Sequence, residues 1–121
     1  MKEILVIDRE TINRTIMRLL LENIGHKVTE AMTCEEGIKK IAEGQFAMVI
    51  TDIRTTDDSM SLSGFDVITT AKARGIRVIL SAKSLTPGEQ DYCLAFPPDA
   101  FLQKPFENSY FQTIVAVTLL D

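Results

Sequence analysis

Residues 4–8 read Ile-Leu-Val-Ile-Asp, four consecutive apolar residues that end at an acidic one. Residues 48–52 repeat this pattern as Met-Val-Ile-Thr-Asp, and residues 78–81 read Val-Ile-Leu-Ser. A short run that is apolar at consecutive positions is typical of a strand that is buried on both faces of a parallel sheet. These three segments therefore predict the central strands of a sheet that helices cover on both sides.

The segment that follows the first strand is predicted to be a helix. Its apolar residues recur at helical spacing and form one stripe, made of Ile12, Ile16, Leu19, Leu20 and Ile24. A weaker strand is expected after it, over residues 28–31. The pattern thus changes from strand to helix and back to strand within the first 31 residues.

Capping signals mark where the later helices begin. Thr33 with Glu36 and Thr86 with Glu89 form capping boxes, and we expect Asn108 to cap a last helix that ends near residue 120. The other expected elements are a helix over residues 64–74 and a strand over residues 100–102. Strands that alternate with helices in this way predict an α/β fold of the (βα)5 kind, a doubly wound, five-stranded parallel sheet.

Length, charge and cysteine content exclude several classes of protein. The 121 residues suit one domain over residues 1–121, and no apolar stretch approaches the roughly 20 residues of a membrane helix. The 13 basic and 17 acidic residues give a net charge of −4, so we expect no direct binding to nucleic acid or membrane. Cys34 and Cys93 lack metal-ligand spacing and are expected to be reduced packing residues of a cytoplasmic protein without a signal peptide.

Four chemically active side chains directly follow predicted strands. Asp8, Asp52, Ser81 and Lys104 each stand at the carboxyl end of a different strand. In a flavodoxin-like sheet of order 2-1-3-4-5, ligands bind beyond these ends, and the first and third strands are neighbours. Each residue alone has an ordinary explanation, namely a helix cap for an aspartate, a turn hydroxyl for the serine and a solvated side chain for the lysine. Their joint placement indicates one shared site.

The chemistry of these four residues suits a phosphoryl group. A carboxylate can act as a nucleophile and form an aspartyl phosphate, while a hydroxyl and an ammonium hold the phosphoryl oxygens. A second carboxylate can help to hold Mg²⁺. The chain contains neither G-x-x-x-x-G-K-S/T nor G-x-G-x-x-G, so a nucleotide cofactor is not expected. No glycine- or Ser/Thr-rich phosphate loop follows the first strand, which argues against a flavin binder.

In these features the chain resembles the receiver domains of two-component response regulators, the CheY-like domains. The resemblance also rests on Gly-His-Lys-Val-Thr-Glu-Ala at 25–31, Gly-Phe-Asp-Val-Ile at 64–68 and Phe-Leu-Gln-Lys-Pro-Phe at 101–106. It implies a signalling protein of a phosphorelay, whose partners are a histidine kinase or phosphotransfer protein and an output domain or downstream protein. It implies no enzyme beyond self-catalysed phosphoryl transfer to the domain and hydrolysis from it.

The resemblance also implies roles for individual residues. Asp52 is the phosphoacceptor, and Ser81 and Lys104 assist the transfer. Ser81 and Phe101 are the switch residues that move when the domain is phosphorylated, although Phe101 lacks a tyrosine hydroxyl. The bond between residues 104 and 105 is cis in the family.

The expected metal site departs from the family pattern. The resemblance implies that Mg²⁺ is held by Asp8, Asp52 and the backbone carbonyl of Arg54. Arg9 stands where the family usually has a second acidic ligand, so the formal charges of Asp8, Asp52, Arg9 and Lys104 sum to zero. We therefore expect weak Mg²⁺ binding. Arg9 either pairs with Asp52 in place of the cation or points to solvent.

Two later segments also depart from the family. Asp52 and Gly64 are 12 positions apart, which is longer than usual, and the loop between them is polar. Asp57 or Asp58 in this loop either folds back as a metal ligand or stays solvated. Residues 96–98, Phe-Pro-Pro, replace a small turn before the last strand, so the partner surface that the fourth helix and last strand form in the family is expected to differ here.

Two functions stay open at this point. The first is a receiver domain that accepts a phosphoryl group on Asp52 and switches a partner surface. The alternative is a phosphorylation-independent pseudo-receiver, a protein-interaction module that a pair between Arg9 and Asp52 would hold in one conformation. A phosphatase that uses Asp52 is not supported, because no evident general acid stands beside it.

Overall fold

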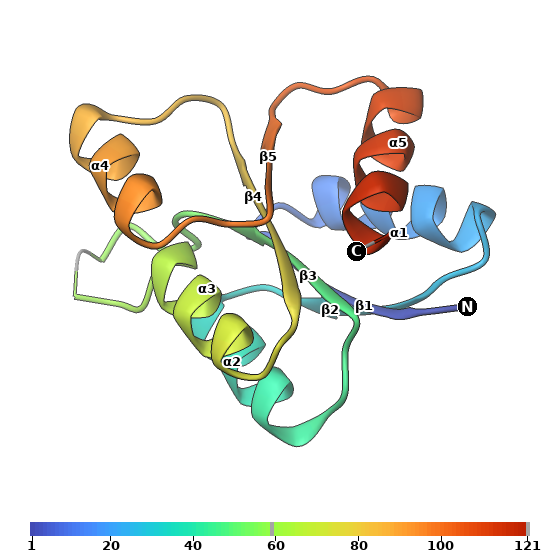
Figure 1. Ribbon diagram of the computed structural model, residues 1–121, viewed down its shortest axis with the longest axis horizontal. Coiled ribbons are helices and arrows are strands. Elements are labelled where there is room, and N and C mark those ends of the chain that lie inside the picture. Colours follow the sequence, from blue (N-terminus) through green and yellow to red (C-terminus); the bar gives the residue numbers. More distant parts are fainter. Residues whose placement is uncertain (59, 121) are drawn as a thin grey trace.

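The computed structural model describes residues 1–58 and 60–120, and its strands and helices alternate as the sequence predicts (Figure 1). All strand pairs are parallel, and the order β2-β1-β3-β4-β5 confirms the predicted order 2-1-3-4-5. The elements in chain order are β1 (Glu3–Ile7), α1 (Thr11–Asn23), β2 (Lys27–Ala31), α2 (Cys34–Glu43), β3 (Met48–Asp52), α3 (Gly64–Ala73), β4 (Arg77–Ala82), α4 (Pro87–Ala95), β5 (Ala100–Gln103) and α5 (Asn108–Leu119).

The core consists of two hydrophobic clusters, one on each face of the sheet. Successive residues of β1 point to opposite faces, so Leu5 and Ile7 belong to one cluster and Ile4 and Val6 to the other. The first cluster includes buried residues of α2 and α3, and the second includes buried residues of α1 and α5. No residue of α4 is buried, and this helix reaches the first cluster through the half-buried Cys93.

The strand ends line up at one edge of the sheet. Ile7, the last residue of β1, pairs with Ala31 on one side and with Thr51 on the other. Asp52, the last residue of β3, pairs with Ser81 of β4. Because the strands are parallel, their carboxyl ends meet at this edge, and the edge carries the polar residues of the predicted site.

Side-chain caps fix the starts of α2, α3 and α4. The Oγ1 atom of Thr33 accepts the Glu36 amide at 3.1 Å, and full capping boxes start α3 and α4 at Ser63 and Thr86. The expected cap at Asn108 is wrong. α5 begins at Asn108 itself, and its N-cap is Glu107, whose side chain makes no capping hydrogen bond.

α1 forms where predicted, but most of its apolar stripe faces solvent. Ile12, Ile16 and Leu19 are 71%, 42% and 55% exposed, whereas Met17 and Leu21 are buried against the sheet. The helix carries apolar residues on more than one face, so periodicity identified the helix without identifying its inner side. The exposed residues lie on the helix that follows Asp8.

No helix in the described ranges is long and apolar enough to span a membrane. Cys34 and Cys93 are both free thiols, the first buried and the second half-buried, as the packing role predicts.

Candidate functional site

The residues at or just after the ends of four strands meet at the carboxyl edge of the sheet. They line or underlie a hollow of about 540 Å³, whose wall includes Asp52, Ser81, Lys104, Arg9 and Arg54. Asp8 lies beneath them and is fully buried. The parallel strands thus place two carboxylates, one hydroxyl and one ammonium within one site.

Lys104 joins the two carboxylates. Its Nζ donates a hydrogen bond to Oδ2 of Asp8 at 2.8 Å and another to Oδ1 of Asp52. The Lys104 side chain is 13% exposed, and the Asp8 and Asp52 side chains are 1% and 11% exposed. Hydrogen bonds between charged groups in so little water are stronger than exposed ion pairs, so this contact fixes the two carboxylates relative to each other.

Burial changes how these groups hold protons. The pKa of Asp52 is raised to about 6. Burial is the largest cause and the neighbouring Asp8 carboxylate adds to it, whereas the hydrogen bond from Lys104 lowers the pKa. Burial alone would lower the pKa of Lys104, but its hydrogen bonds to Asp52 and Asp8 raise it above the ordinary value. Lys104 therefore stays charged at neutral pH, and Asp52 is mostly ionised there and mostly protonated at pH 5.

Ser81 presents an unpartnered hydroxyl to the site. The residue is 1% exposed, and its Oγ makes no hydrogen bond within the described residues. A buried polar atom without a partner is costly, and such atoms concentrate where a ligand completes the hydrogen bonding. Because Ser81 pairs with Asp52 across the sheet, an oxygen bound at the Asp52 carboxylate would lie on the same edge as this hydroxyl.

Arg9 has a different partner from the one proposed. Its Nη1 lies 3.0 Å from Oδ1 of Asp57, and the two side chains are 43% and 93% exposed. The hypothesis that Arg9 pairs with Asp52 is therefore wrong, because the Arg9 guanidinium is paired with Asp57. Asp57 does not return to Asp52 as a metal ligand, and Asp58 accepts the Met60 amide instead.

The acidic groups that could hold a metal are few. In residues 1–58 and 60–120 no three His, Cys, Asp or Glu side chains lie close enough together to share an ion. Asp8 and Asp52 are the two carboxylates that Lys104 joins, and Glu10 and Glu89 also line the hollow. Mg²⁺ prefers six oxygen ligands. Asp8 and Asp52 therefore fit a site with few protein ligands, which a backbone carbonyl, such as that of Arg54, and water would complete.

Phe101 lies on β5 beside the site. It pairs with Leu80 of β4 and is half-buried against the cluster that includes α2 and α3. The peptide bond between Lys104 and Pro105 is cis, as the resemblance implies.

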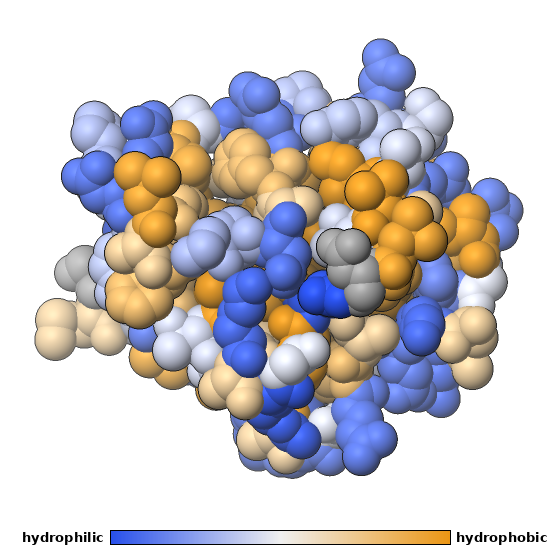
Figure 2. Space-filling view, in the orientation of Figure 1, coloured by the Kyte–Doolittle hydropathy of each residue, from blue (hydrophilic) through white to orange (hydrophobic). Residues whose placement is uncertain are grey.

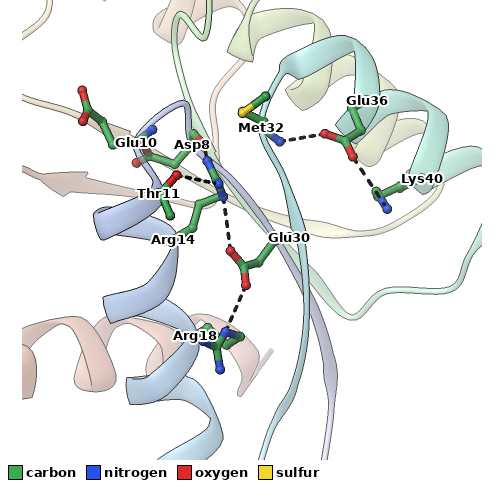
Figure 3. A network of polar contacts seen from close by, with 9 residues as sticks. All are labelled: Asp8, Glu10, Thr11, Arg14, Arg18, Glu30, Met32, Glu36 and Lys40. Atoms are coloured by element: carbon green, nitrogen blue, oxygen red, sulfur yellow. Dashed lines mark hydrogen bonds and ion pairs between the residues drawn. The ribbon is translucent and has the colours of Figure 1, made fainter.

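Two residues near the site carry no motif and were missed by sequence reasoning. Arg14 of α1 donates to the backbone carbonyl of Asp8 at 2.7 Å and lies beside Glu30 of β2 (Figure 3). Thr55 is buried and accepts the Cys34 amide at 2.9 Å, which ties the loop after β3 to the start of α2. A helical arginine and a loop threonine are common, so only their contacts single them out.

The chain is similar to known signalling proteins along nearly its whole length. The family model of the response regulator receiver domain matches residues 4–116. The sensory/regulatory protein RpfC of Xanthomonas campestris pv. campestris is 32% identical over 124 residues, which cover 97% of this chain and 15% of that protein. Hybrid signal transduction histidine kinase F of Dictyostelium discoideum is 28% identical over 109 residues, 86% of this chain and 10% of the kinase.

A solved structure agrees with these relatives. A CheY-like response regulator receiver domain protein from Methanospirillum hungatei JF-1 matches with a TM-score of 0.88 and 25% identity, over 98% of this chain and 94% of that one. The chain spans 10% and 15% of the two curated relatives, so only their receiver portion is comparable. The fold, the strand-end residues and the match over residues 4–116 agree: the chain belongs to the response regulator receiver domain family of two-component systems.

Proposed function

We propose that this receiver domain, over residues 1–121, accepts a phosphoryl group on Asp52. The observation that carries the proposal is the placement of Asp52 between the Lys104 ammonium and the strand neighbour Ser81, whose buried hydroxyl is unpartnered. An Asp52 carboxylate oxygen attacks the phosphorus of a phosphohistidine, the phosphorus–nitrogen bond breaks and the imidazole leaves with the electron pair. Lys104 and Ser81 hold the phosphoryl oxygens of the acyl phosphate that forms.

The donor we propose is a histidine kinase or phosphotransfer protein, since receiver domains pair with these proteins and both curated relatives are sensory or kinase proteins. A docking surface lies next to the site. Ile12 and Ile16 are exposed on the helix that begins three residues after Asp8. Apolar side chains that are exposed beside a reactive group are typical of a protein-binding surface. An output domain or a downstream protein would read the phosphorylated state.

The switching surface that we propose is the one around α4. None of its residues is buried, and Tyr92 packs between Phe65 and Phe96 with tilted rings and ring-centroid distances of 4.7 and 5.5 Å. Figure 2 shows hydrophobic side chains over α4 and α5 on one face of the molecule. A helix with so few buried contacts can shift at small cost, so movement of Ser81 and Phe101 on phosphorylation would reach a partner there.

We propose weak Mg²⁺ binding, although receiver domains typically bind Mg²⁺ at this acidic pocket. When bound, the ion would neutralise phosphoryl charge. Asp8 and Asp52 supply two ligands, while the third acidic position holds Arg9, whose guanidinium faces Asp57. Receiver domains are signalling modules, so we expect no turnover of a separate substrate, only phosphoryl transfer to Asp52 and its hydrolysis.

The pseudo-receiver alternative loses its main support. It required a pair between Arg9 and Asp52, and Arg9 instead contacts Asp57. Asp52, Ser81 and Lys104 all line the hollow, which supports the proposal that this chain accepts a phosphoryl group. The free thiols of Cys34 and Cys93 support a cytoplasmic location, which we keep as part of the proposal.

The test is the intact mass of the protein after incubation with acetyl phosphate, with and without Mg²⁺. We expect the wild-type chain to gain one phosphoryl group, and Asp52→Ala to gain none. Asp91→Ala, which removes an exposed carboxylate on α4, is the matched control and should gain the group as the wild type does. An equal gain in Asp52→Ala, or no gain in wild type with either acetyl phosphate or a histidine phosphotransfer protein, would refute the proposal.

A further inference from the structure

The turn between β1 and α1 carries part of the site, yet α1 starts without a side-chain cap. Glu10 is the N-cap, and its side chain makes no capping hydrogen bond. α2, α3 and α4 all have such caps, at Thr33, Ser63 and Thr86. The first turn of a helix leaves backbone groups without partners, so the start of α1 must be held in another way.

Arg14, one turn further along α1, holds the turn through other groups, because its guanidinium donates to acceptors on the turn and on β2. Its Nη1 donates to the carbonyl oxygen of Asp8 at 2.7 Å, and its Nη2 donates to Oγ1 of Thr11 at 3.1 Å. Its Nε donates to Oε1 of Glu30 on β2 at 3.2 Å. Figure 3 shows the guanidinium between the turn and the edge strand. The side chain is 11% exposed, and its planar guanidinium donates to three partners through three different nitrogens.

Each polar atom of Asp8 has a partner. Its N–H donates to the carbonyl of Ala31 at 3.1 Å, and its carbonyl accepts from Arg14. Of its carboxylate oxygens, Oδ1 accepts the Glu10 amide at 2.8 Å and Oδ2 accepts Lys104 at 2.8 Å. Arg14 also contacts the side chain of Glu30 on β2, so it ties the turn at Asp8 to the edge strand from outside the site.

We propose that Arg14, anchored by Glu30, is a positioning residue for the phosphorylation site. By holding the Asp8 carbonyl it fixes the carboxylate that shares Lys104 with Asp52. The inference rests on the proposed function, because its consequence for activity is the rate at which Asp52 takes up a phosphoryl group. A small displacement of a group at a reacting centre can slow a reaction strongly.

Arg18 provides a matched control. Its Nε lies 3.0 Å from the other carboxylate oxygen of Glu30, and its Nη1 lies 3.2 Å from Glu22. It thus shares the Glu30 partner of Arg14 but makes no contact with Asp8. A general loss of ion pairing on α1 would affect variants of both arginines, whereas loss of the Asp8 contact affects variants of Arg14 alone.

The experiment compares Arg14→Gln with Arg18→Gln in two measurements. The first is hydrogen exchange of the Glu10 amide by NMR, with the Val49 amide in the core as the reference for global opening. The second is the initial rate of phosphorylation by acetyl phosphate. For Arg14→Gln we expect Glu10 exchange at least about tenfold faster relative to Val49 and phosphorylation at least about tenfold slower. Arg18→Gln should stay within about twofold of wild type in both.

Equal effects of the two substitutions, or an unchanged Glu10 exchange in Arg14→Gln, would overturn the positioning role. If Arg14→Gln does not fold, Glu30→Gln takes its place, and it should change both measurements in the same direction by a smaller factor. A wild-type chain that takes up no phosphoryl group would refute the proposed function, while the Glu10 exchange would still decide the role of Arg14.

Discussion

Asp52→Asn should change the pH dependence of stability in a direction that the structure fixes. The carboxyl of Asp52 has its pKa raised from 3.8 to about 6 because it is buried beside Asp8. The folded chain therefore binds more protons than the unfolded chain between these two values. The contribution of the Asp52 carboxyl to the stability of the fold is fully present below pH 3.8 and is lost as the pH rises through 6.

The rise of the Asp52 pKa to about 6 corresponds to about 3 kcal/mol over the full pH range, and to about 1 kcal/mol between pH 5 and 8. Asparagine cannot ionise, so the variant avoids this loss. Removing the carboxylate also takes one charged partner from Lys104, but Lys104 stays charged throughout. The stability of Asp52→Asn relative to wild type should therefore rise by about 1 kcal/mol from pH 5 to pH 8.

The assay is urea unfolding followed by circular dichroism at pH 5, 6, 7 and 8, in EDTA so that no divalent cation binds the carboxylates. Asp91→Asn, which neutralises an exposed carboxylate on α4, is the control and should keep a constant difference from wild type. A difference between Asp52→Asn and wild type that stays constant, or that falls as the pH rises, would refute the reasoning. A falling difference would mean that the ion pair with Lys104 outweighs burial, and a constant difference would mean that the two effects cancel.

Three further predictions concern the Asp52 carboxyl, the Arg9 guanidinium and the Phe111 side chain in the core. The carboxyl carbon of Asp52 should titrate near pH 6 by ¹³C NMR in EDTA, and a midpoint below 4 would contradict the effect of burial. Arg9→Asp should raise the Mg²⁺ affinity measured by calorimetry by about tenfold or more, because a repelling charge becomes a ligand; Asp57→Asn, which only frees Arg9, should not raise it. Phe111→Ala should cost about 3–5 kcal/mol in urea unfolding, because the ring is fully buried and stacks on Phe106 at 5.1 Å, whereas Leu94→Ala, at an 82% exposed position, should cost less than about 0.5 kcal/mol.

The sheet and its carboxyl edge were predictable because few rules decide them. Continuous apolar runs mark buried parallel strands, and the order of such a sheet determines which strand ends are neighbours. This is why the sequence alone predicts that Lys104 lies near Asp8, 96 positions away in the chain. The orientation of α1 was not predictable in the same way, because Ile12 and Met17 are both apolar and only packing decides which one is buried.

The partner of Arg9 could not be predicted from the sequence pattern. Whether Arg9 reaches Asp52 or Asp57 depends on the path of the loop after β3, which no periodicity specifies. The role of Arg14 also depends on the distance from a helix to an edge strand. Long polar side chains can reach several partners, so sequence spacing limits their choices without selecting one.

The two expected departures from the family pattern are linked in space. Arg9 stands where the resemblance implies an acidic ligand, and the loop after β3, which we expect to be longer than usual, supplies Asp57, which pairs with Arg9 at 3.0 Å. Because both side chains are exposed, the pair is weakly held and Arg9 can exchange partners at little cost. A phosphoryl group on Asp52 would add negative charge at the mouth of the same hollow, where Arg9 and Arg54 lie. Arg9 would then find a second anionic partner, so the longer loop and the arginine together leave the site able to balance phosphoryl charge with fewer metal ligands.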